Sequence, residues 1–451
     1  MNKKKWALLI LAALFIFGYI KLFYKTYSET AVARSADCII ALDVKRITNT
    51  LIWNYITTPG QWKTGKLFSK SSDKISWKDM VELPDYILAF HAANQPANAW
   101  YMLLNIKSKT GFEKGLLQFQ FEKIKNTEYL GKAYGIRIII KDNQILVGNA
   151  APENADHIRT VADELFNKKS YISKTTLSKA IKASSHMAVY IAANSFLQEE
   201  AVIAANFNKR QIEISGKITP KRQYNFAETD FSYCSTSLCT AGFTQPPGAF
   251  FELLNKTNKD KISTALNINV DSVMRRENSH YNLNLAEIKQ RTDSAISYTY
   301  DEEFNKIETI VVNNIEEPAF NFTITGDSVA GIYTYLQRSK KLERTATGDL
   351  FTPMPFVKSY CSKNSEKQLA ITAANYISAA EAEDKSVNAI FFLNLVFTRI
   401  PEKMQKYLPG DIMQAISNIA AAKLSATKNK EQVLLSCIIE KKKNDLPIIK
   451  F

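Results

Sequence analysis

The first 24 residues, MNKKKWALLILAALFIFGYIKLFY, constrain the fold most, because no other run in the chain is apolar and long enough to cross a membrane. Trp6 to Ile20 is a stretch without charge, and the apolar character resumes after Lys21 and ends at Tyr24. A helix needs about 20 residues to cross a bilayer, and a lysine near its end can extend its ammonium to the headgroups. The sequence therefore predicts a transmembrane helix over residues 6–24.

A cleaved signal peptide is the alternative for this segment. Its cleavage site would be the small-x-small sequence Ala31–Ala33, which lies more than ten residues beyond Ile20 and follows bulky Phe23 and Tyr27. A signal peptidase site normally follows the apolar region closely. A lipoprotein signal would need a cysteine there, and Cys38 is too distant. We therefore expect an anchor that is retained.

The charges around this helix predict its orientation. Lysines 3–5 precede the helix, whereas Lys21, Lys25 and Arg34 follow it. The tight amino-terminal cluster favours a cytoplasmic amino terminus by the positive-inside rule. The expected location is the inner membrane, crossed once, with the main body in the periplasm.

Composition predicts a folded body with more than one domain. The chain has 46% hydrophobic and 23% charged residues, which is typical of globular proteins, and about 420 residues beyond the anchor exceed what one core usually serves. The net charge of +14 would attract anionic envelope components or acidic protein partners; it also fits an ordinary lysine-rich surface. Nucleic acid is excluded as a partner, because the chain has no zinc pattern and no basic recognition helix.

Residue patterns predict mostly strands in hairpins, with a few helices. Alternating apolar residues indicate strands at the stretches that follow: residues 37–44, 86–107, 115–124, 135–150, 184–191, 201–219, 261–271, 280–288, 295–312, 319–327 and 389–397. Helical spacing or capping indicates helices over 151–166 and 327–344 and a short one near 192–196. The fold class predicted is α+β, with antiparallel sheets and packed helices after an amino-terminal transmembrane helix.

Three segments recur in the same order in the second half of the chain. Residues 136–150 resemble 357–374, 184–196 resemble 384–397, and 201–219 resemble 419–439. Either the chain is duplicated or these are chance likenesses between strands. A duplication gives an anchor and linker at 1–35, a first unit at 36–225 and a second at 226–451. The hairpin tips, 208–210 and 428–430, would then be exposed and basic, and ligands would meet the junction of the two lobes.

The search for catalytic chemistry finds no site. GQWKTGKL, residues 60–67, lacks the Ser or Thr that a phosphate-binding loop needs after its lysine. The four histidines, His91, His157, His186 and His280, are scattered, and no metal-binding spacing occurs. Neighbouring carboxylates such as Glu316 and Glu317 point to opposite faces of a strand, or form a turn before Pro318. We expect no catalytic residue, metal or cofactor.

Cys234 and Cys239, in YCSTSLCTAGF, are the one local feature with chemical content. They are separated by four residues in a turn-rich stretch, and in an oxidising periplasm they could close a small disulfide loop. In a reducing compartment they would be ordinary thiols, and the spacing argues against a redox-active pair.

Three functional classes remain open from the sequence. The first is a non-enzymatic binding or scaffolding protein of bacterial envelope type, which works through sheet faces, edges or a groove. The second is a carrier or chaperone for lipid or lipoprotein, with an apolar groove. The third is an envelope enzyme whose site is too dispersed to read. No motif resembles a known family at the level of residues.

Overall fold

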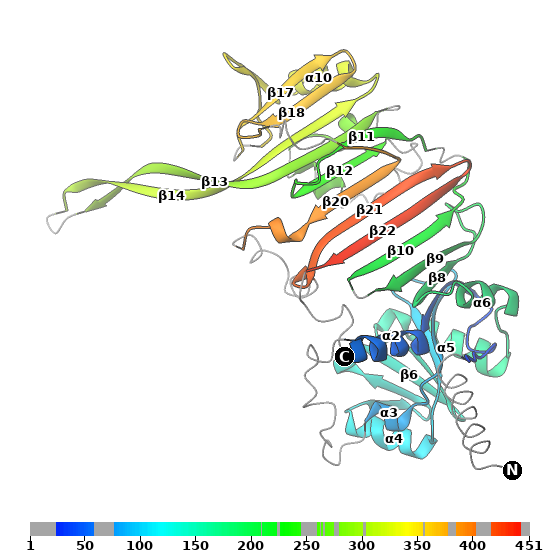
Figure 1. Cartoon of the computed structure of the whole chain (residues 1–451). Coiled ribbons are helices and arrows are strands. Elements are labelled where there is room, and N and C mark those ends of the chain that lie inside the picture. Colours follow the sequence, from blue (N-terminus) through cyan, green and yellow to red (C-terminus); the bar gives the residue numbers. More distant parts are fainter. Residues whose placement is uncertain are drawn as a thin grey trace, which may run out of the picture. The chain divides into compact units, whose positions relative to one another are not determined.

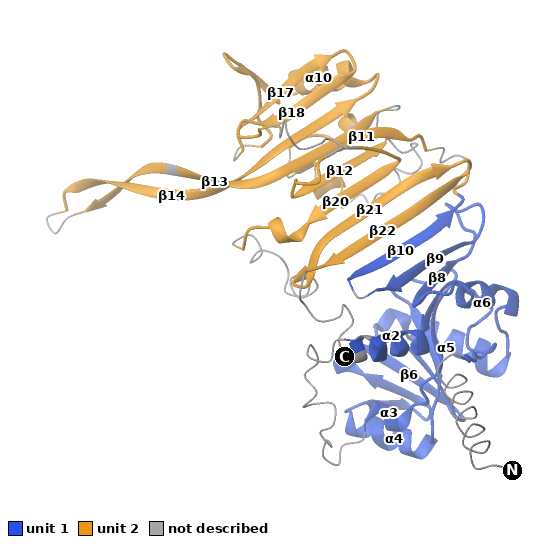
Figure 2. Ribbon diagram, in the orientation of Figure 1, with its two compact units in different colours: residues 1–219, 446–451 blue, residues 220–445 orange. Residues whose placement is uncertain are grey.

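The computed structural model describes residues 24–57, 76–208, 210–222, 226–244, 259–261, 263–264, 267–274, 279–300, 304–354, 357–377, 385–402 and 416–442. The chain divides into two compact units between Thr219 and Pro220 (Figure 2). The expected anchor and the sequence at residues 60–67 lie outside the described residues, except for Tyr24 at the end of the anchor. Within the described ranges, no helix combines the length and the apolar character needed to cross a bilayer.

Unit 1 is built on one antiparallel sheet (Figure 1). Its strands are β1 (Ala36–Asp43), β2 (Tyr86–Ala92), β3 (Trp100–Asn105), β4 (Glu122–Lys125), β5 (Glu128–Gly131), β6 (Ile136–Lys141), β7 (Gln144–Asn149), β8 (Met187–Ile191), β9 (Ala201–Phe207) and β10 (Gln211–Ile218). They lie side by side in the order β4-β5-β6-β7-β3-β2-β1-β8-β9-β10. The first strand of the unit is therefore central, and the last two form one edge.

Helices cover both faces of this sheet. They are α2 (Val44–Thr57), α3 (Trp77–Met80), α4 (Lys109–Gln118), α5 (Ala155–Ala162) and α6 (Lys174–Ile181), with short 3₁₀ turns at Lys132–Tyr134 and Pro152–Asn154 and a π-helical turn at Asp163–Asn167. Strand alternation sends Leu103 and Leu104 to opposite faces. Leu103 belongs to a core with α5 and α6, and Leu104 packs against a second core with α3 and α4.

The segment that follows the expected anchor belongs to unit 1. Ala31, Val32 and Ala33 are buried in its core, with exposed fractions of 7%, 0% and 0%. The Arg34 amide donates to the Ser170 carbonyl at 3.2 Å. Residues 24–35 therefore pack as part of unit 1 and are not an extended linker that precedes it.

Unit 2 has its own antiparallel sheet. Its strands are β12 (Cys239–Thr244), β13 (His280–Tyr300), β14 (Lys306–Thr325), β15 (Leu342–Thr345), β16 (Gly348–Phe351), β17 (Ser359–Ser365), β18 (Gln368–Ala373), β20 (Phe391–Val396), β21 (Ile419–Asn429) and β22 (Gln432–Lys441). They are ordered β15-β16-β17-β18-β14-β13-β12-β20-β21-β22. Two further strands, β11 (Thr229–Tyr233) and β19 (Lys385–Ala389), pair with each other. Helices α9 (Val270–Met274) and α10 (Val329–Arg338) pack on one sheet face, and a 3₁₀ turn spans Phe397–Arg399.

Strand for strand, the two sheets have the same order along the chain and in space. β1 of unit 1 takes the place of β12 in unit 2, and the pairing registers agree as well. Cys38 opposes Ile191 on one side and His91 on the other, and Cys239 opposes Leu395 and Leu285 in the same way. The closing hairpins β9–β10 and β21–β22 occupy matching edges.

The match extends to helix α4 and helix α10, which are of equal length. Ser108 precedes the first and Ser328 precedes the second. Both helices end through a residue with positive φ, Gln120 at 59° and Lys340 at 53°. The closing hydrogen bonds also correspond: Phe121 N to Leu116 O at 2.9 Å, and Lys341 N to Leu336 O at 2.9 Å. This is the Schellman closure, in which the chain reverses through a left-handed residue.

Several expected elements are wrong. The stretch 115–124, predicted as a strand with Leu117, Phe119 and Phe121 on one face, is helical to Gln118, and only its last residues, from Glu122, lie in a strand, β4. Leu117 is 64% exposed and Phe121 is buried. Helical spacing dominates because Phe112 and Leu116, one turn apart, are both fully buried. No helix follows β8 at residues 192–196.

Two further corrections concern unit 2. In the stretch 261–271, the described residues contain helical turns and the start of α9 instead of a strand. Glu316 and Glu317 lie within β14 instead of forming a turn before Pro318. Pro318 is tolerated in the strand because a β-bulge at Leu285/Glu287 lies close to its partner, Ile288, where the ladder is already irregular.

Candidate binding sites

The first candidate site is a projecting hairpin of unit 2. Only the inner ends of β13 and β14 join the sheet: β13 pairs with β12 through residues 280–285, and β14 with β18 through 321–325. Farther out, the two strands pair only with each other in the part of the chain that is described. We call residues 290–300 and 304–314 the arm; it extends away from the rest of unit 2 (Figure 1). In unit 1, the corresponding connection is the short turn 93–99.

The arm has one apolar face. Directly opposed residues of an antiparallel pair share a face, so the pair Ile296–Ile310 lies on the same side as the alternating pairs around it. The large apolar side chains of this face are Ile296, Tyr298, Tyr300, Ile310 and Val312, with exposed fractions of 63%, 46%, 66%, 71% and 61%. We call these five residues the apolar face of the arm. The opposite face has fewer large apolar side chains: Ser297 is opposed to Thr309, and Ile307 and Val311 are 47% and 40% exposed.

Two contacts link the strands of the ribbon to each other: Arg291 Nε lies 2.9 Å from Glu317 Oε1 near the base, and the Lys306 ammonium lies 3.5 Å from the Tyr298 ring centre farther out. A two-stranded ribbon without further packing is at best marginally stable in water. Exposed, clustered apolar side chains usually mark a contact surface. The arm therefore has the features of a ribbon that is stabilised when its apolar face contacts another molecule.

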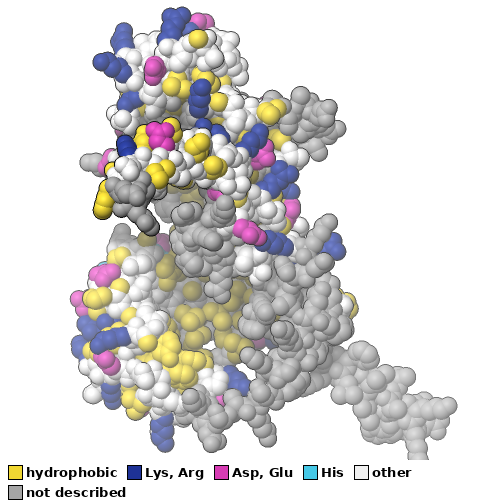
Figure 3. Space-filling model, turned by 90° about the vertical axis from the view of Figure 1, so that its left-hand side faces the viewer, with side chains coloured by type: hydrophobic (Ala, Val, Ile, Leu, Met, Phe, Trp, Pro, Cys, Tyr) yellow, Lys and Arg dark blue, Asp and Glu magenta, His cyan; other side chains and the backbone are white. Residues whose placement is uncertain are grey.

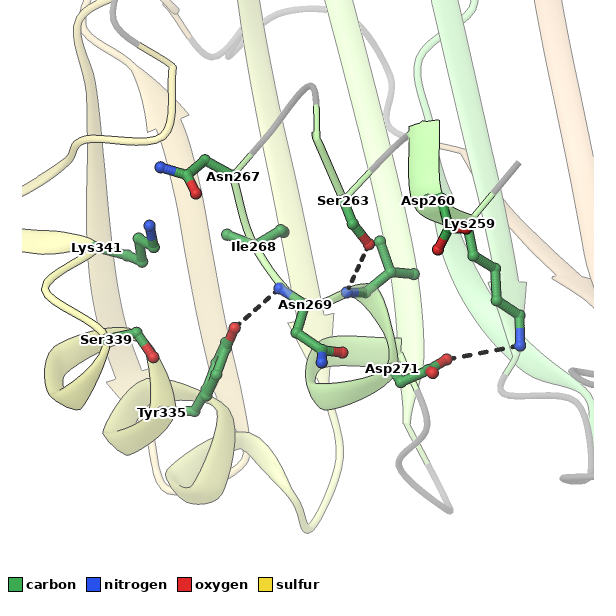
Figure 4. A pocket seen from close by; sticks show the side chains of 11 residues that line it. Lys259, Asp260, Ser263, Asn267, Ile268, Asn269, Asp271, Tyr335, Ser339 and Lys341 are labelled. Carbon is green, nitrogen blue, oxygen red and sulfur yellow. Dashed lines mark hydrogen bonds and ion pairs between the residues drawn. The ribbon is translucent and has the colours of Figure 1, made fainter. Parts of the chain in front are cut away.

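The second candidate site is a hollow in unit 2 between α9, α10 and the sheet. Its outer part is an open pocket of about 890 Å³ whose wall includes Asn269, Tyr335, Ser339 and Lys341 (Figure 4). Its inner part, of about 370 Å³, has only apolar side chains in its wall: Ile268, Val273, Leu283, Leu285, Pro318, Phe320, Phe322, Ile324, Ile332, Leu336, Phe351, Met354 and Ile371. Ile268 is common to the walls of both parts.

Hydrogen bonds and charge shape the mouth of the hollow. The Asn269 amide donates to the Tyr335 hydroxyl at 2.9 Å, which ties the start of α9 to α10. Lys259 pairs with Asp271 at 3.6 Å on one side of the pocket (Figure 4). On the other side Lys341 points toward Asn267, and no ion pair of Lys341 occurs among the described residues. The wall of the outer pocket therefore holds two lysines and two aspartates, with Lys341 on the side away from Asp260 and Asp271 (Figure 4).

The cysteines and histidines expected to be of interest are dispersed. Cys234 lies in the turn after β11, and Cys239 begins β12; both are thiols in this structure. Burial raises the pKa of Cys239, whereas hydrogen bonds from Ser237 and Thr236 outweigh burial and lower the pKa of Cys234. A disulfide between them stays a prediction for the oxidised protein.

The four histidines occupy separate structural positions. His91 Nδ1 lies 2.7 Å from Asp37 Oδ1, and His186 Nε2 lies 2.7 Å from Thr50 Oγ1. His157 lies on α5, and His280 begins β13. Among the described residues, no group of three or more His, Cys, Asp and Glu side chains is placed to hold a metal ion.

The basic hairpin tips are exposed where they are described. Asn208 and Arg210 are exposed at the turn after β9, and Lys430 is exposed at the turn after β21. Lys428 lies within β21 instead of at the tip, and its ammonium donates to the Phe226 carbonyl at 2.9 Å. On the face seen in Figure 3, Lys and Arg side chains of the described residues are interspersed with acidic ones and form no single patch.

Comparison with known proteins gives no relationship to build on: the chain matches no protein-family model, no curated protein and no solved structure. The sequence did not predict the arm, and it allowed an apolar groove only as one alternative, without placing it at this position. Alternation over 295–312 indicated a strand, but did not indicate that the strand leaves the sheet.

Proposed function

We propose that this chain is a non-enzymatic, membrane-anchored binding protein of the bacterial envelope, and that the arm is its docking element for another protein. The observation that carries the proposal is the apolar face of the arm, five large side chains exposed to solvent on a ribbon with little support of its own. Seating that face on a partner would remove the exposed apolar area from water and stabilise the ribbon.

The charge of the arm favours a protein over a lipid surface. Within residues 293–308 the sequence has Asp293, Asp301, Glu302, Glu303 and Glu308 against the single cation of Lys306. An anionic bilayer surface repels a segment with this charge. A protein surface with an apolar groove and basic residues at its rim matches both the apolar face and the net negative charge of this segment.

An internal duplication explains where the docking element lies. The matching strand order and registers support the view that units 1 and 2 are repeats of one ancestral unit, with a boundary near residue 220. The connection between the second and third strands is a short turn at 93–99 in unit 1 and the arm in unit 2. On this view the arm is an elaboration of one repeat, which is where a new binding function would arise.

The proposed location is the inner membrane, with residues 6–24 as the anchor and the body in the periplasm. The packing of the following segment supports retention of the anchor, because cleavage after Ala33 would remove the buried residues Ala31–Ala33 from unit 1. Lys25 pairs with Asp43, and the Thr26 amide donates to Asp85 at 2.8 Å. The folded body would therefore begin directly at the membrane surface.

Photo-cross-linking from the two faces of the arm tests this function. Benzoylphenylalanine is placed in the full-length chain in cells at Ile310, on the apolar face, or at the adjacent Thr309, on the opposite face. We expect a discrete adduct with another protein from position 310 and a much weaker one from 309. The adduct should disappear when Ile296→Thr and Val312→Thr remove apolar groups from the same face.

Three results would count against the proposal. Equal adducts from both faces would show that the apolar face is not the docking surface. An adduct with twice the mass of the chain would show self-association instead of a separate partner. Cross-linking to lipid alone would favour the bilayer as the occupant of the arm.

A further inference from the structure

We propose that the hollow of unit 2 binds a single-chain anionic amphiphile, with its hydrocarbon chain in the inner apolar part and its acidic headgroup beside Lys341. This site lies outside the arm and is independent of protein docking. It gives unit 2 a second binding activity, directed at a fatty acid or a molecule of the same build.

The comparison of the two units shows how the hollow arises. In unit 1 the same place is filled by aromatic rings: Trp77 stacks on Phe119 with 5.0 Å between ring centres, and Phe121 lies edge-on to Trp77 at 6.1 Å. By the matched helix positions, Phe119 corresponds to Ser339 and Phe121 to Lys341. The aromatic rings of Phe119 and Phe121 are therefore replaced, at the mouth of the hollow, by the small Ser339 and the flexible Lys341.

The short helix before the second strand shows the same change. α3 and α9 each lie before that strand and pack on the matched helix, α4 or α10. Trp77 and Val270 are their first residues, and Met80 and Val273 stand three positions later, both buried. Deeper in, fully buried Phe112 corresponds to fully buried Ile332. At each of these positions unit 2 has the smaller side chain.

One change runs in the opposite direction. Gly131 corresponds to Phe351, which now lines the inner part of the hollow. In unit 2, Phe351 therefore fills space beside the sheet, while the smaller side chains at the other matched positions open the hollow. An apolar cavity of this size is larger than cavities of about 150 Å³ that accept benzene, and it falls within the range of natural ligand sites.

The chemistry of the walls selects the ligand class. The inner part contains only apolar side chains, so it offers no hydrogen bond to a polar ligand and favours hydrocarbon. The outer part offers the Lys341 ammonium, the Ser339 hydroxyl and the Asn267 amide around the opening (Figure 4). A carboxylate or phosphate there would form a charge-assisted hydrogen bond with Lys341. Hydrocarbon inside and an anion outside define an anionic amphiphile.

A photoreactive fatty acid tests the site in the full-length protein. Diazirine-bearing palmitic acid is added to membranes that contain the protein, irradiated, and mapped by peptide mass spectrometry. We expect labelling of β13 and β14 residues that line the inner part, such as Leu285 and Phe320. Val270→Trp with Val273→Met, which restores the side chains of unit 1, should lower this labelling about tenfold or more, because the larger side chains fill space that the hydrocarbon chain would occupy and leave part of it in water.

Further variants test recognition of the headgroup and of the hydrocarbon chain separately, and a milder substitution controls for misfolding. Lys341→Gln should lower labelling by the acid but leave labelling by the diazirine-bearing alcohol unchanged. Val273→Met alone, a mild change, should give a partial decrease. The reciprocal variant Trp77→Val with Met80→Val should create labelling at Leu104 and Val147 of unit 1, where the wild type has little.

The outcomes decide the proposal without reference to the arm. Labelling that is unchanged by the Trp and Met substitutions, or that is confined to the arm, would overturn the site. An equal loss of acid and alcohol labelling in Lys341→Gln would overturn the role of the cation. The arm variant Ile296→Thr should leave labelling of the hollow unchanged whether or not the arm docks a protein.

Discussion

Replacing Glu128 by glutamine should destabilise unit 1 strongly, because this carboxylate is shared by two buried or half-buried arginines. Arg137 Nη1 donates to Glu128 Oε1, and Arg159 Nε donates to Glu128 Oε2 at 3.1 Å. The side chains of Glu128 and Arg137 are only 4% and 8% exposed. The two guanidinium groups hold the pKa of Glu128 below its usual range even though burial alone would raise it.

The expected magnitude follows from that burial. Removing one partner of a buried ion pair leaves an uncompensated charge, which costs about 3–5 kcal/mol of unfolding free energy. All five tryptophans precede Pro220, so none belongs to unit 2, and apart from Trp6 in the proposed anchor their fluorescence reports on unit 1. In urea, with an m-value of about 2–3 kcal/mol/M, the unit 1 midpoint should fall by about 1–2.5 M.

A matched variant controls for the general effect of losing a carboxylate. Asp156 also pairs with Arg159, at 2.9 Å, but its side chain is 91% exposed. Asp156→Asn should therefore change the unfolding free energy by about 1 kcal/mol at most. Replacing Glu128 and Arg137 together by methionine should recover much of the loss. Equal midpoints for Glu128→Gln and Asp156→Asn would refute this reasoning.

Three further predictions concern other parts of the chain. Burial opposes protonation of His91, but the hydrogen bond with Asp37 outweighs it and raises the His91 pKa; its contribution to stability is therefore present below the unfolded pKa of about 6.5 and is lost as pH rises through the folded value. Asp37→Asn should flatten this pH dependence of the unit 1 urea midpoint, and an unchanged profile would contradict it. Gly115→Ala should lower the unfolding free energy of unit 1 by about 1–3 kcal/mol despite better helix propensity, because the new Cβ would lie 1.8 Å from Met80 Sδ. For Gly111→Ala the nearest atom to the new Cβ is 3.6 Å away, so the change should be neutral or better, and the reverse ranking would refute the packing argument. In protein isolated from the native envelope without reductant, mass spectrometry should find Cys234 and Cys239 joined, two hydrogens lighter than the dithiol; full alkylation of both in fresh cells would remove the disulfide and weaken the periplasmic assignment.

Local patterns were sufficient to predict much of the sheet. The hairpin over 136–149 has two apolar, β-branched segments joined by an Asp-Asn turn, and Asp142 in that turn has a positive φ of 52°. The helix over 151–166 was predicted from the spacing of Ile158, Val161, Leu165 and Phe166, of which the first three are buried. In these segments the local sequence alone shows whether the chain forms a strand or a helix.

Segments whose period is ambiguous were not predicted correctly. In residues 115–124, Leu117, Phe119 and Phe121 alternate as in a strand, while Phe112 and Leu116 have helical spacing. Which pattern prevails depends on what is buried against the sheet, and that is a tertiary property. Similarly, strand alternation in 295–312 predicts pairing but does not specify whether a neighbouring strand covers the face.

The candidate sites depend on a comparison that sequence alone did not provide. Identities between residues 108–131 and 328–351 are few, and they became meaningful only when both segments showed the same capping, turn and register. The replacement of Trp77, Phe119 and Phe121 by Val270, Ser339 and Lys341 then marks the hollow. Catalytic motifs do not mark the hollow, because it results from side chains that are smaller than those at the matched positions of unit 1.

Hydrogen exchange of the arm amides tests the central claim, that the arm is completed by a protein partner, most directly. The rates for residues 290–300 and 304–314 would be measured by mass spectrometry in the purified full-length protein, in protein reconstituted into liposomes, and in native membranes. The account predicts fast exchange in the first two, as expected for a marginally stable ribbon, and clear protection in native membranes that is lost in Ile296→Thr with Ile310→Thr. Equal exchange in all three settings, or protection already present in liposomes, would contradict it.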